Sequence, residues 1–563
     1  MAEQLSDTEA GMAPVTTQLE DIVTSPARRR LYVEAGLWDE STMVGRVERW
    51  ASTRPDAVAV VDDRGRRATY AELWRDATAL ALHLVAHGVR PGDVVSVQLP
   101  NRYEAVVAAV AVQRAAAVIN TLLPGYRARE LRHVFETAGT RVIVTPQEYR
   151  GFEYAPMVAA LRAETGLDVH HVVAGPGAPG AESLDSILGA PGGDGGTLPP
   201  PQPAGAVSEL IFTSGTEAAP KAIMHTEQTA NFSVRAAYAD LGMSDADVVW
   251  MPSPVGHSTG FNYGLRMALY SGLPLVLQDV WSAATACDLV AAEGCTYTLA
   301  ATTFLKDLVE EAARRGVRLT SLQRFGCGGA PVPPELVDAA LEQGIQVLRL
   351  YGSTEVLVGT WNRPGGPIAK RRHTDGVAMS HVEVELRDDE GRPVPTGAQG
   401  EIHTRGPNTC VGFFRDPERT ARTFADGWVR SGDVAVMDGD GYIAIVGRKK
   451  EIIIRGGMNI TPREIEDVLL RFPEVHRAAV VGLPDERLGE RACACLVLRE
   501  GATLDFAEMV RRLRAEGMAD YKLPERMELL GELPSTASGK VQKHEIVRAL
   551  MERDPQGRWD RGS

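Results

Sequence analysis

The sequence predicts an α/β protein. We expect a large N-terminal domain of βαβ subdomains plus a β-subdomain, followed by a small, mobile α+β C-terminal domain. From Ala57 onward, short apolar runs alternate with stretches of helical periodicity, which is the pattern of parallel βαβ units. Two apolar runs flank residues 438–441 (DGDG) and predict a β-hairpin. A stretch of about 115 residues follows this hairpin, which is the size of one small domain.

The expected elements follow in chain order. The first strand is expected at 57–61 and the first helix at 69–87, where Thr69 and Glu72 have the spacing of a capping box. The apolar run at 105–112 is expected to lie in a buried helix. Further helices are expected at 104–118, 462–472 and 506–516, and further strands at 93–98, 209–212, 275–280, 296–300, 346–349, 434–437, 442–446, 478–481 and 492–498.

Three stretches suggest domain boundaries. Residues 1–28 are polar without clear periodicity and are expected to be a disordered N-terminal segment. Residues 174–205 are crowded with Gly and Pro and predict a loop or linker. A boundary at Gly447–Lys450 separates a predicted domain at 29–447, which would bind ATP and an acid, from a mobile domain at 448–563.

Composition excludes several classes of protein. The chain has 563 residues, of which 44% are hydrophobic and 24% charged, as in globular proteins generally. Its net charge of −14 argues against a nucleic-acid partner, which needs a basic face. The longest apolar run is far shorter than the ~20 residues that a membrane span requires.

The cysteines and the N-terminus indicate a cytoplasmic protein. None of the six cysteines forms a CxxC pair, and no histidine cluster accompanies them at zinc spacing, so we expect reduced core thiols. Cys493 and Cys495 alternate in an apolar run and are expected on one face of a strand. The N-terminus lacks the apolar region of a signal peptide.

Residues 210–221 (LIFTSGTEAAPK) carry the most informative motif. An apolar strand leads into a loop rich in hydroxyl groups that ends in a lysine. Hydroxyl and backbone N–H groups suit an oligophosphate, and lysine adds a positive charge. Since GxxxxGK[ST] is absent, P-loop chemistry is disfavoured, and an ordinary polar turn is the alternative. The candidate phosphate-binding residues are Thr213, Ser214, Gly215, Thr216 and Lys221.

Further motifs follow in order along the chain. Each by itself is compatible with a turn, but their combination over residues 45–545 resembles the adenylate-forming superfamily of acyl-CoA synthetases, peptide-synthetase adenylation domains and luciferases. The motifs are Gly328-Gly329-Ala330-Pro331, Tyr351-Gly352-Ser353-Thr354-Glu355, Ser431-Gly432-Asp433, Gly447-Arg448-Lys449-Lys450, residues 456–462 (GGMNITP) and residues 533–540 (LPSTASGK).

This resemblance implies the cofactors ATP, Mg²⁺ and coenzyme A and a set of nucleotide ligands. The loop at 213–221 would hold the β- and γ-phosphates. The adenine pocket would comprise Gly328, Gly329, Ala330 and Tyr351, with Pro331, Gly352 and Ser353 beside them. Thr354 would bind the α-phosphate, Glu355 and Thr216 would serve Mg²⁺, Asp433 would accept both ribose hydroxyls, and Arg448 would support the ribose.

The resemblance also implies a catalytic lysine and a moving domain. Lys540 would stabilise negative charge that grows on the α-phosphate during carboxylate attack, where removing one preorganised donor costs ~10²–10³ in rate. A solvated surface lysine is the alternative. Lys450 matches the hinge, and Gly457 would line the channel for the pantetheine arm of coenzyme A.

The acyl pocket is expected to include Gly260, Phe261, Gly328, Val356 and Leu357. His257 is the candidate gate of this pocket; the alternative is a hydrogen-bonded core histidine. The phosphate loop departs from the family pattern TSGTTGxPKG at Glu217, Ala218 and Ala222, which replace Thr, Gly and Gly.

The TSGTE opening and residues 30–38 (RLYVEAGLW) resemble the branch of medium-chain and cyclohexanecarboxylate-type ligases. The Ala/Arg/Gly-rich composition is also compatible with relatives that activate bulky polycyclic acids in natural-product pathways.

The predicted function is therefore an ATP-dependent ligase that couples a carboxylic acid to coenzyme A through an acyl-adenylate. Its expected partners are a small-molecule acid, ATP and coenzyme A, with no nucleic acid and no membrane span, and a homodimer is allowed for. One alternative loads an acyl or aryl acid onto a carrier protein; no fused carrier domain follows Lys540, and no Asn beside His257 suggests an aryl acid. Residues 252–264 contain no acid for an amino-acid substrate. A non-catalytic nucleotide-binding relative and a luciferase-like oxidative second step remain alternatives.

Overall fold

The computed structural model describes residues 23–190, 196–213, 220–329, 332–456, 458–485, 487–535 and 541–553. The chain divides into two compact units, which we call unit 1 and unit 2. Unit 1 comprises Met1–Tyr238, Ser244–Trp281 and Pro407–Gly427, and unit 2 comprises Ala239–Met243, Ser282–Gly406 and Trp428–Ser563.

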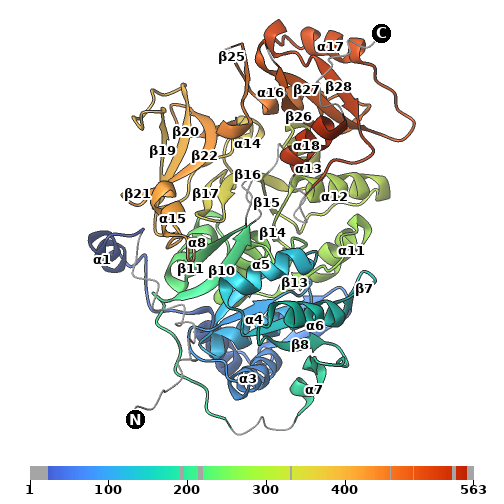
Figure 1. Ribbon diagram of the computed structural model, residues 1–563. Coiled ribbons are helices and arrows are strands. Elements are labelled where there is room, and N and C mark those ends of the chain that lie inside the picture. The colour runs from blue at the N-terminus through green and yellow to red at the C-terminus, as the bar shows by residue number, and fades with distance from the viewer. Residues whose placement is uncertain are drawn as a thin grey trace, which may run out of the picture. The chain divides into compact units, whose positions relative to one another are not determined.

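Unit 1 is built around a seven-stranded sheet (Figure 1). Its order is β11 (Lys221–Thr226), β10 (Val207–Thr213), β4 (Val118–Thr121), β3 (Val94–Val97), β5 (Val142–Pro146), β8 (His170–Ala174) and β9 (Glu182–Ser183). All neighbours are parallel except β10 and β11, which form an antiparallel pair. A second group of strands is β1 (Val58–Asp62), β2 (Arg67–Thr69), β12 (Val249–Met251) and β13 (Leu275–Leu277).

The helices of unit 1 connect and cover these strands. They are α1 (Pro26–Glu34), α2 (Met43–Thr53), α3 (Tyr70–Ala86), α4 (Tyr103–Arg114), α5 (Ala128–Ala138), α6 (Tyr154–Thr165), α7 (Leu184–Gly189), α8 (Glu227–Asp240), α9 (Ser258–Gly260), the π-helix η2 (Phe261–Arg266), α10 (Met267–Ser271) and α15 (Pro417–Thr423). Short strands are β6 (Glu148–Tyr149), β7 (Phe152–Glu153) and β21 (Phe424–Ala425). The predicted capping box is confirmed, because the Thr69 hydroxyl accepts from the Glu72 amide and the Glu72 carboxylate accepts from the Thr69 amide.

Unit 2 contains three groups of strands. The first has the order β14 (Tyr297–Ala300), β15 (Arg324–Gly328), β16 (Gln346–Ser353), β17 (Leu357–Trp361) and β18 (Val377–Ala378), with the first three strands parallel. The second comprises the antiparallel strands β19 (Glu383–Arg387), β20 (Gln399–Arg405), β22 (Trp428–Met437) and β23 (Ile443–Arg448). The third comprises β24 (Ile453–Arg455), β25 (Met458–Ile460), β26 (Val475–Asp485), β27 (Gly489–Leu498) and β28 (Arg526–Leu529).

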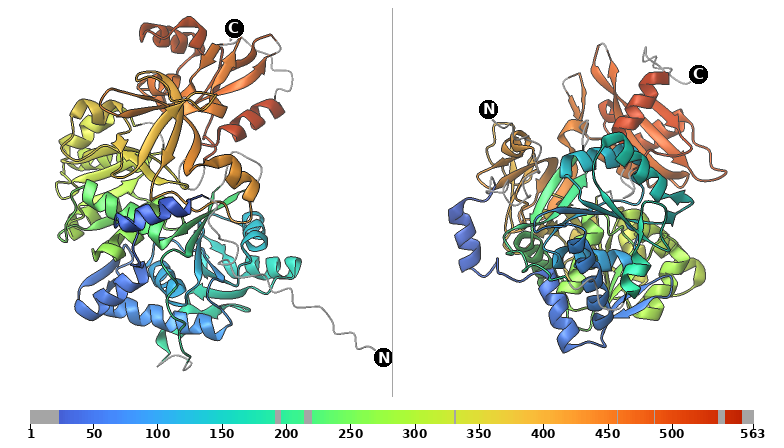
Figure 2. Two further views of the ribbon diagram at one scale, coloured as in Figure 1. Left: turned by 90° about the vertical axis from the view of Figure 1, so that its left-hand side faces the viewer. Right: turned by 60° about the horizontal axis from the view of Figure 1, so that its bottom comes forward.

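Figures 1 and 2 draw the C-terminal strands and helices of unit 2 in orange and red. Their sheet separates two apolar clusters. Ala492, Ala494 and Leu496 pack with residues of α16 (Pro462–Leu469) and α17 (Phe506–Ala515). Cys493 and Cys495 face the other way, toward α18 (Lys543–Arg553), which confirms that they share one face of a strand. The remaining helices are α11 (Ala283–Glu293), α12 (Thr302–Arg315), α13 (Pro334–Glu342), α14 (Ile368–His373), and the 3₁₀ turns η3 (Lys449–Glu451) and η4 (Asp520–Lys522).

The fold class predicted from the sequence is confirmed, with local differences. The helix expected at 104–118 ends at Arg114, because the backbone reverses at Ala116 (φ 55°) and Val118 joins the sheet. The segment 1–28 was expected to be disordered, yet α1 begins at Pro26, capped by the Ser25 hydroxyl. Residues 1–22 lie outside the described part of the chain.

Other expectations hold in part. The Gly/Pro-rich stretch 174–205 contains β9 and α7 as well as loops. The strand expected at 346–349 extends to Ser353, so it carries part of the YGSTE motif into the sheet. The hairpin around 438–441 is confirmed by the antiparallel pairing of β22 and β23. Across the described residues, no helix is both long and apolar enough to cross a bilayer.

Candidate active site

A cavity of about 740 Å³ lies within unit 2, where three parallel strands end. Its lining includes Thr302 after β14, Gly329 after β15 and Tyr351 near the end of β16. The carboxyl ends of parallel strands are where open α/β sheets place ligands. Five of the residues singled out from the sequence line this cavity: Gly329, Tyr351, Gly352, Asp433 and Arg448.

A buried carboxylate organises one wall of the cavity. Asp433 and Arg448 are cross-strand partners on β22 and β23, so their side chains meet. The Arg448 Nε lies 3.0 Å from Asp433 Oδ1, and the Tyr351 hydroxyl donates to Asp433 Oδ2 at 3.0 Å. The arrangement fixes the orientation of both carboxylate oxygens at the cavity.

The Asp433 carboxylate changes the pKa values of its two partners, Tyr351 and Arg448. Burial raises the pKa of Tyr351 well above its ordinary value, and the Asp433 carboxylate raises it further. Burial opposes the charge of Arg448, but Asp433 and Glu451 outweigh this effect, so the pKa of Arg448 is raised. Arg448 is therefore a permanent cation at the cavity.

The turn between β16 and β17 carries the end of the YGSTE motif. Glu355 is a largely buried carboxylate, close enough to raise the pKa of both Tyr351 and Arg448. Val356 and Leu357 are buried apolar residues that follow it. Gly352 is required for this turn, because a Cβ there would lie 2.0 Å from the Leu357 carbonyl oxygen.

A buried ion pair that sequence reasoning missed positions the cavity strands. Arg349 on β16 reaches Asp375 at 3.0 Å, and the second Asp375 oxygen accepts from the Ile445 amide on β23 at 2.9 Å. The pair thus ties the strand that carries Tyr351 to the strand that carries Arg448. No local sequence signal joins an arginine and an aspartate that lie so far apart in the chain.

The C-terminal part of unit 2 contributes basic residues to the cavity. Lys543, the first residue of α18, lies 2.7 Å from Glu466 and 3.4 Å from Glu451. Burial opposes its charge, but Glu466 and Glu451 raise the pKa of Lys543. The lining also includes Arg463, Arg471, His476, Arg477 and Arg499. Sequence reasoning missed these residues, since they belong to no motif.

The predicted phosphate loop begins with Thr213 at the end of β10 and ends with Lys221 at the start of β11 in unit 1. Thr213 and Lys221 are cross-strand partners at its base, and the Thr213 hydroxyl is buried without a hydrogen-bond partner among the described residues. The Lys221 Nζ lies 5.1 Å from the centre of the Phe413 ring. Ala222, where the family pattern has Gly, pairs with Phe212 in regular strand, so this position does not need the backbone freedom of glycine.

A buried ionic network, also missed from the sequence, anchors β10 and β11. Arg266 on η2 is fully buried and lies 2.7 Å from Glu227 and 3.3 Å from Glu209. Glu209 is on β10, and Glu227 follows β11 directly. The Glu227 carboxylate also accepts from the Met43 amide, Gln113, Ser208 and Asn231.

The two carboxyl groups of this network differ in pKa. Burial raises the pKa of Glu209, and Arg266 offsets only part of that rise. Burial acts on Glu227 in the same direction, but Arg266 and the hydrogen-bond donors outweigh it and lower the pKa of Glu227. The ion pair of Arg266 with Glu227 is therefore stronger than its ion pair with Glu209.

The gate candidate and part of the predicted acyl pocket lie together in unit 1. His257 caps α9, and its Nδ1 accepts from the Thr259 amide at 3.3 Å. Gly260 is held against the chain, because a Cβ there would lie 2.2 Å from the Pro254 carbonyl oxygen. Phe261 is buried and begins η2. The other pocket candidates, Gly328, Val356 and Leu357, belong to unit 2.

Several predicted site residues lie outside the described part of the chain. They are Ser214, Gly215, Thr216, Ala330, Pro331, Gly457 and Lys540, together with the departures Glu217 and Ala218. The hinge candidate Lys450 is exposed in η3, between β23 and β24. Ser535 and Val541 form a β-bridge at the base of the segment that contains Lys540, and Val541 lines the cavity.

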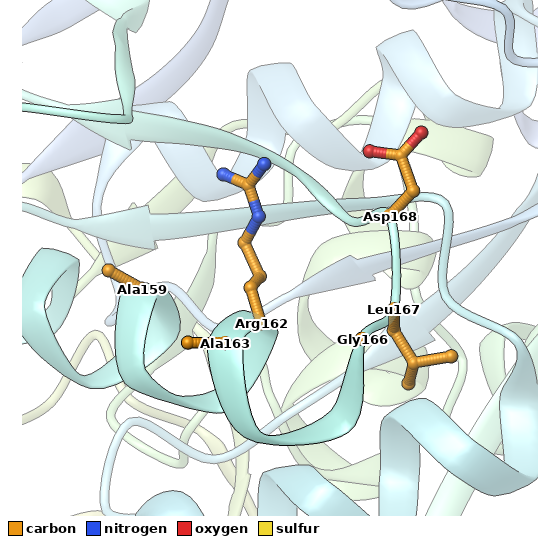
Figure 3. Close-up of a pocket in the computed structure, with 6 residues that line it drawn as sticks. All are labelled: Ala159, Arg162, Ala163, Gly166, Leu167 and Asp168. Atoms are coloured by element: carbon orange, nitrogen blue, oxygen red, sulfur yellow. The ribbon is translucent and has the colours of Figure 1, made fainter.

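A second pocket, of about 450 Å³, lies at the end of α6 (Figure 3). It is lined by Arg162, Asp168 and small or apolar residues, and none of the predicted site residues lines it. It is therefore separate from the residues that the motifs identify.

Comparison with known proteins decides the family. Residues 47–414 match the AMP-binding enzyme family, and residues 464–540 match the AMP-binding enzyme C-terminal domain. The chain belongs to the AMP-binding enzyme family. The predicted relationship to adenylate-forming acyl-CoA synthetases is thereby confirmed.

Individual relatives of this AMP-binding enzyme agree with that assignment. The medium-chain fatty-acid–CoA ligase of Escherichia coli (strain K12) is 36% identical over 528 residues, covering 93% of each chain. A feruloyl-CoA synthase of Amycolatopsis sp is 34% identical, covering 89% of this chain and 97% of its own. The solved amide bond synthetase McbA from Marinactinospora thermotolerans is 30% identical, with a TM-score of 0.79 over 90% of this chain and 99% of that one.

Proposed function

We propose that this AMP-forming acyl-CoA synthetase activates a medium-chain, alicyclic or bulky polycyclic acid. The acid and ATP form an acyl-adenylate and pyrophosphate, and coenzyme A then displaces AMP to give the acyl-CoA. The observation that carries this proposal is the cavity at the ends of β14, β15 and β16, where Asp433, Tyr351 and Arg448 converge.

Asp433 is proposed to hold the ribose of the nucleotide. An ionised carboxylate offers about four lone-pair sites, so with Tyr351 and Arg448 bound it retains acceptors for two hydroxyl groups. Gly329, Tyr351 and Gly352 line this cavity and are proposed to contact adenine, with Gly328, Ala330, Pro331 and Ser353 as further candidates from the sequence.

Glu355 and the loop from Thr213 to Lys221 are proposed to handle the phosphates. Glu355 is a buried carboxylate, the ligand type that Mg²⁺ prefers, so the donor fits this ion, with Thr216 as the second candidate. When bound, Mg²⁺ neutralises phosphate charge. Thr354 would bind the α-phosphate, and Lys221 would add a cation at the β- and γ-phosphates.

Two residues are proposed to serve different half-reactions. Lys540 would stabilise the adenylation transition state, and Gly457 would admit the pantetheine arm after the domain at 448–563 rotates about Lys450. In support, Val541 and Lys543, close after Lys540 in the chain, line the same cavity as Asp433 and Arg448.

The acid is proposed to bind beside His257, Gly260, Phe261, Val356 and Leu357. The apolar character of the last three suits an aliphatic or alicyclic chain. The 36% identity to a ligase of medium-chain fatty acids points the same way. A carrier-protein thiol is the alternative acceptor.

The test is mass spectrometry of acyl-CoA and AMP. Purified protein is incubated with ATP, Mg²⁺, coenzyme A and a pool of linear, alicyclic, aryl and polycyclic acids. Lys540→Ala should lower product formation by ~10²–10³, whereas the matched variant Lys522→Ala, a lysine of the same domain paired with Glu464, should not. Acyl-adenylate without thioester would favour a carrier-protein acceptor, and no adenylate from any acid would contradict the proposal.

We also propose a cytoplasmic location, because ATP and coenzyme A are the substrates and all six cysteines are free and buried. A homodimer stays a prediction, which light scattering of the purified protein would test.

A further inference from the structure

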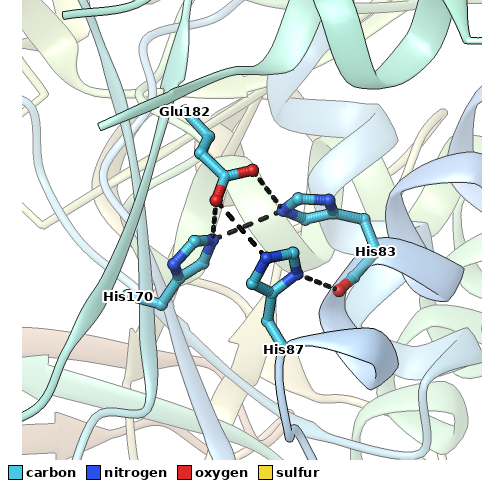
Figure 4. Close-up of side chains that lie close together, drawn as sticks. All are labelled: His83, His87, His170 and Glu182. Carbon is cyan, nitrogen blue, oxygen red and sulfur yellow. Dashed lines mark hydrogen bonds and ion pairs between the residues drawn. The ribbon is translucent and has the colours of Figure 1, made fainter. Parts of the chain in front are cut away.

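Four potential metal ligands meet in unit 1, among residues that the motifs did not identify (Figure 4). His83 and His87 are one turn apart at the end of α3, His170 is the first residue of β8, and Glu182 is the first residue of β9. Parallel pairing of Val172 with Glu182 brings the carboxylate beside the histidine of β8. Figure 4 shows the four side chains pointing toward one common point.

Four printed distances between their ligand atoms are close to those of a tetrahedral site, and one ligand atom from each residue lies within 4.8 Å of the others. His83 Nε2 lies 3.3 Å from His170 Nε2 and 3.4 Å from a Glu182 oxygen. The other Glu182 oxygen lies 3.3 Å from His87 Nε2 and 3.7 Å from His170 Nε2. A tetrahedral zinc ion with bonds of ~2.0–2.1 Å separates its ligand atoms by about 3.3 Å.

The hydrogen bonding orients one imidazole for metal binding. His87 Nδ1 lies 2.8 Å from the His83 carbonyl oxygen, which can only accept, so Nδ1 carries the proton. The lone pair of His87 Nε2 is therefore directed into the cluster. A second hydrogen bond that fixes the tautomer in this way accompanies most metal-binding histidines.

The contact between His83 and His170 is compatible with either a hydrogen bond or a shared metal ion. When both Nε2 atoms present lone pairs at 3.3 Å, they repel unless a proton or a metal ion lies between them. His83 is largely buried, whereas His87 and Glu182 are partly exposed, so an ion can enter from solvent. Ser183 donates to the Gly175 carbonyl at 2.7 Å, which orders the connection that carries Glu182.

We propose that His83, His87, His170 and Glu182 bind one zinc ion. Three imidazoles and a carboxylate suit zinc, and a tetrahedral arrangement disfavours Cu²⁺ and Ni²⁺, which prefer tetragonal sites. Because four protein ligands leave no open position, the ion is structural: it joins the end of α3 to the edge strands β8 and β9. Acid activation does not require it.

The test measures zinc on the full-length protein after chelator treatment and removal of the chelator. The stripped protein is dialysed against Zn²⁺ alone, and bound metal is measured by inductively coupled plasma mass spectrometry. The variants are His87→Gln and Glu182→Gln, both at partly exposed positions, and the matched control is His544→Gln, an exposed histidine outside the cluster.

We expect one zinc ion per chain in the wild type and the control, and an affinity more than about 10-fold weaker in both cluster variants. Zinc should raise the Tm of the wild type and the control but not of the cluster variants. Cobalt(II) should give the intense visible bands of a tetrahedral site only in the wild type and the control.

Three results would overturn the proposal. The first is a folded wild type that binds no zinc, which would leave a shared proton between the imidazoles. The second is equal zinc binding by the cluster variants. The third is loss of acyl-CoA formation by zinc-free protein that is still folded, with Mg²⁺ supplied.

Discussion

Replacing Glu227 by Gln should destabilise the protein far more than the same change at Glu209. Glu227 accepts five hydrogen bonds, and both of its oxygens are used. A glutamine amide has one oxygen. If that oxygen accepts from Arg266, Gln113 and Ser208, the glutamine NH₂ group points at the N–H donors of Met43 and Asn231. Those two donors then have no acceptor.

The magnitude follows from these hydrogen bonds. Stranding buried donors costs about 1–3 kcal/mol each, and breaking a buried ion pair costs about 3–5 kcal/mol, so Glu227→Gln should cost about 4 kcal/mol or more. In Glu209→Gln the oxygen can keep the Asn262 donor, and the change removes the longer contact with Arg266, at 3.3 Å. That ion pair is already weak, because burial raises the pKa of Glu209 more than Arg266 lowers it. That change should cost about 1 kcal/mol.

The assay is urea denaturation followed by circular dichroism for the wild type and both variants. A lower midpoint with an unchanged slope reports lost stability of the native state. The reasoning is that the number of hydrogen bonds and the distance to Arg266 decide how much each carboxyl group stabilises the protein. Similar losses of unfolding free energy in the two variants, or a larger loss in Glu209→Gln, would refute it.

Three further predictions concern pH and catalysis. The pKa of Glu209 is raised from 4.5 to about 7, so its contribution to stability is complete below pH 4.5 and is lost as the pH rises toward 7. The urea midpoint of the wild type should therefore fall relative to that of Glu209→Gln between pH 4.5 and 7. Above pH 7 the difference between the two midpoints should stay constant. Asp433→Ala removes a charged acceptor and should lower kcat/KM for ATP by about 10–100-fold, and Tyr351→Phe should lower it less; equal effects would contradict the ribose assignment. Lys540→Ala should slow adenylation by ~10²–10³ while leaving thioester formation from added acyl-adenylate intact. Gly457→Trp should do the reverse, and single-turnover assays of each step would show it.

Much of the fold could be predicted because its signals are local. The capping box at Thr69, the buried helix at 105–112 and the alternation of apolar runs each depend on neighbours within a few residues. The errors lie at element ends, such as Ala116, where pairing of Val118 with Val94 in the sheet decides where the helix ends. Tertiary pairing prevails over local propensity there.

The candidate site divides in the same way. Asp433, Tyr351 and Arg448 were predicted because they sit in short motifs of the family, and the structure brings these three together at one cavity. Arg349 and Asp375, which brace the same strands, have no motif. Their pairing depends on where the fold places the segment between α14 and β18, which carries Asp375, and single-sequence periodicity does not contain that placement.

By itself, the sequence determined the α/β fold class, the order of the nucleotide motifs and the family. These properties can be identified from short segments, because a loop that binds phosphate needs the same residue types wherever it lies in the chain. Only the tertiary structure decided which distant side chains share a buried site. His83 and His170 are far apart in the chain, as are Arg266 and Glu227. A charged or polar group costs free energy when folding buries it away from water, unless a partner is buried beside it. The choice of partner is therefore made only in the folded structure.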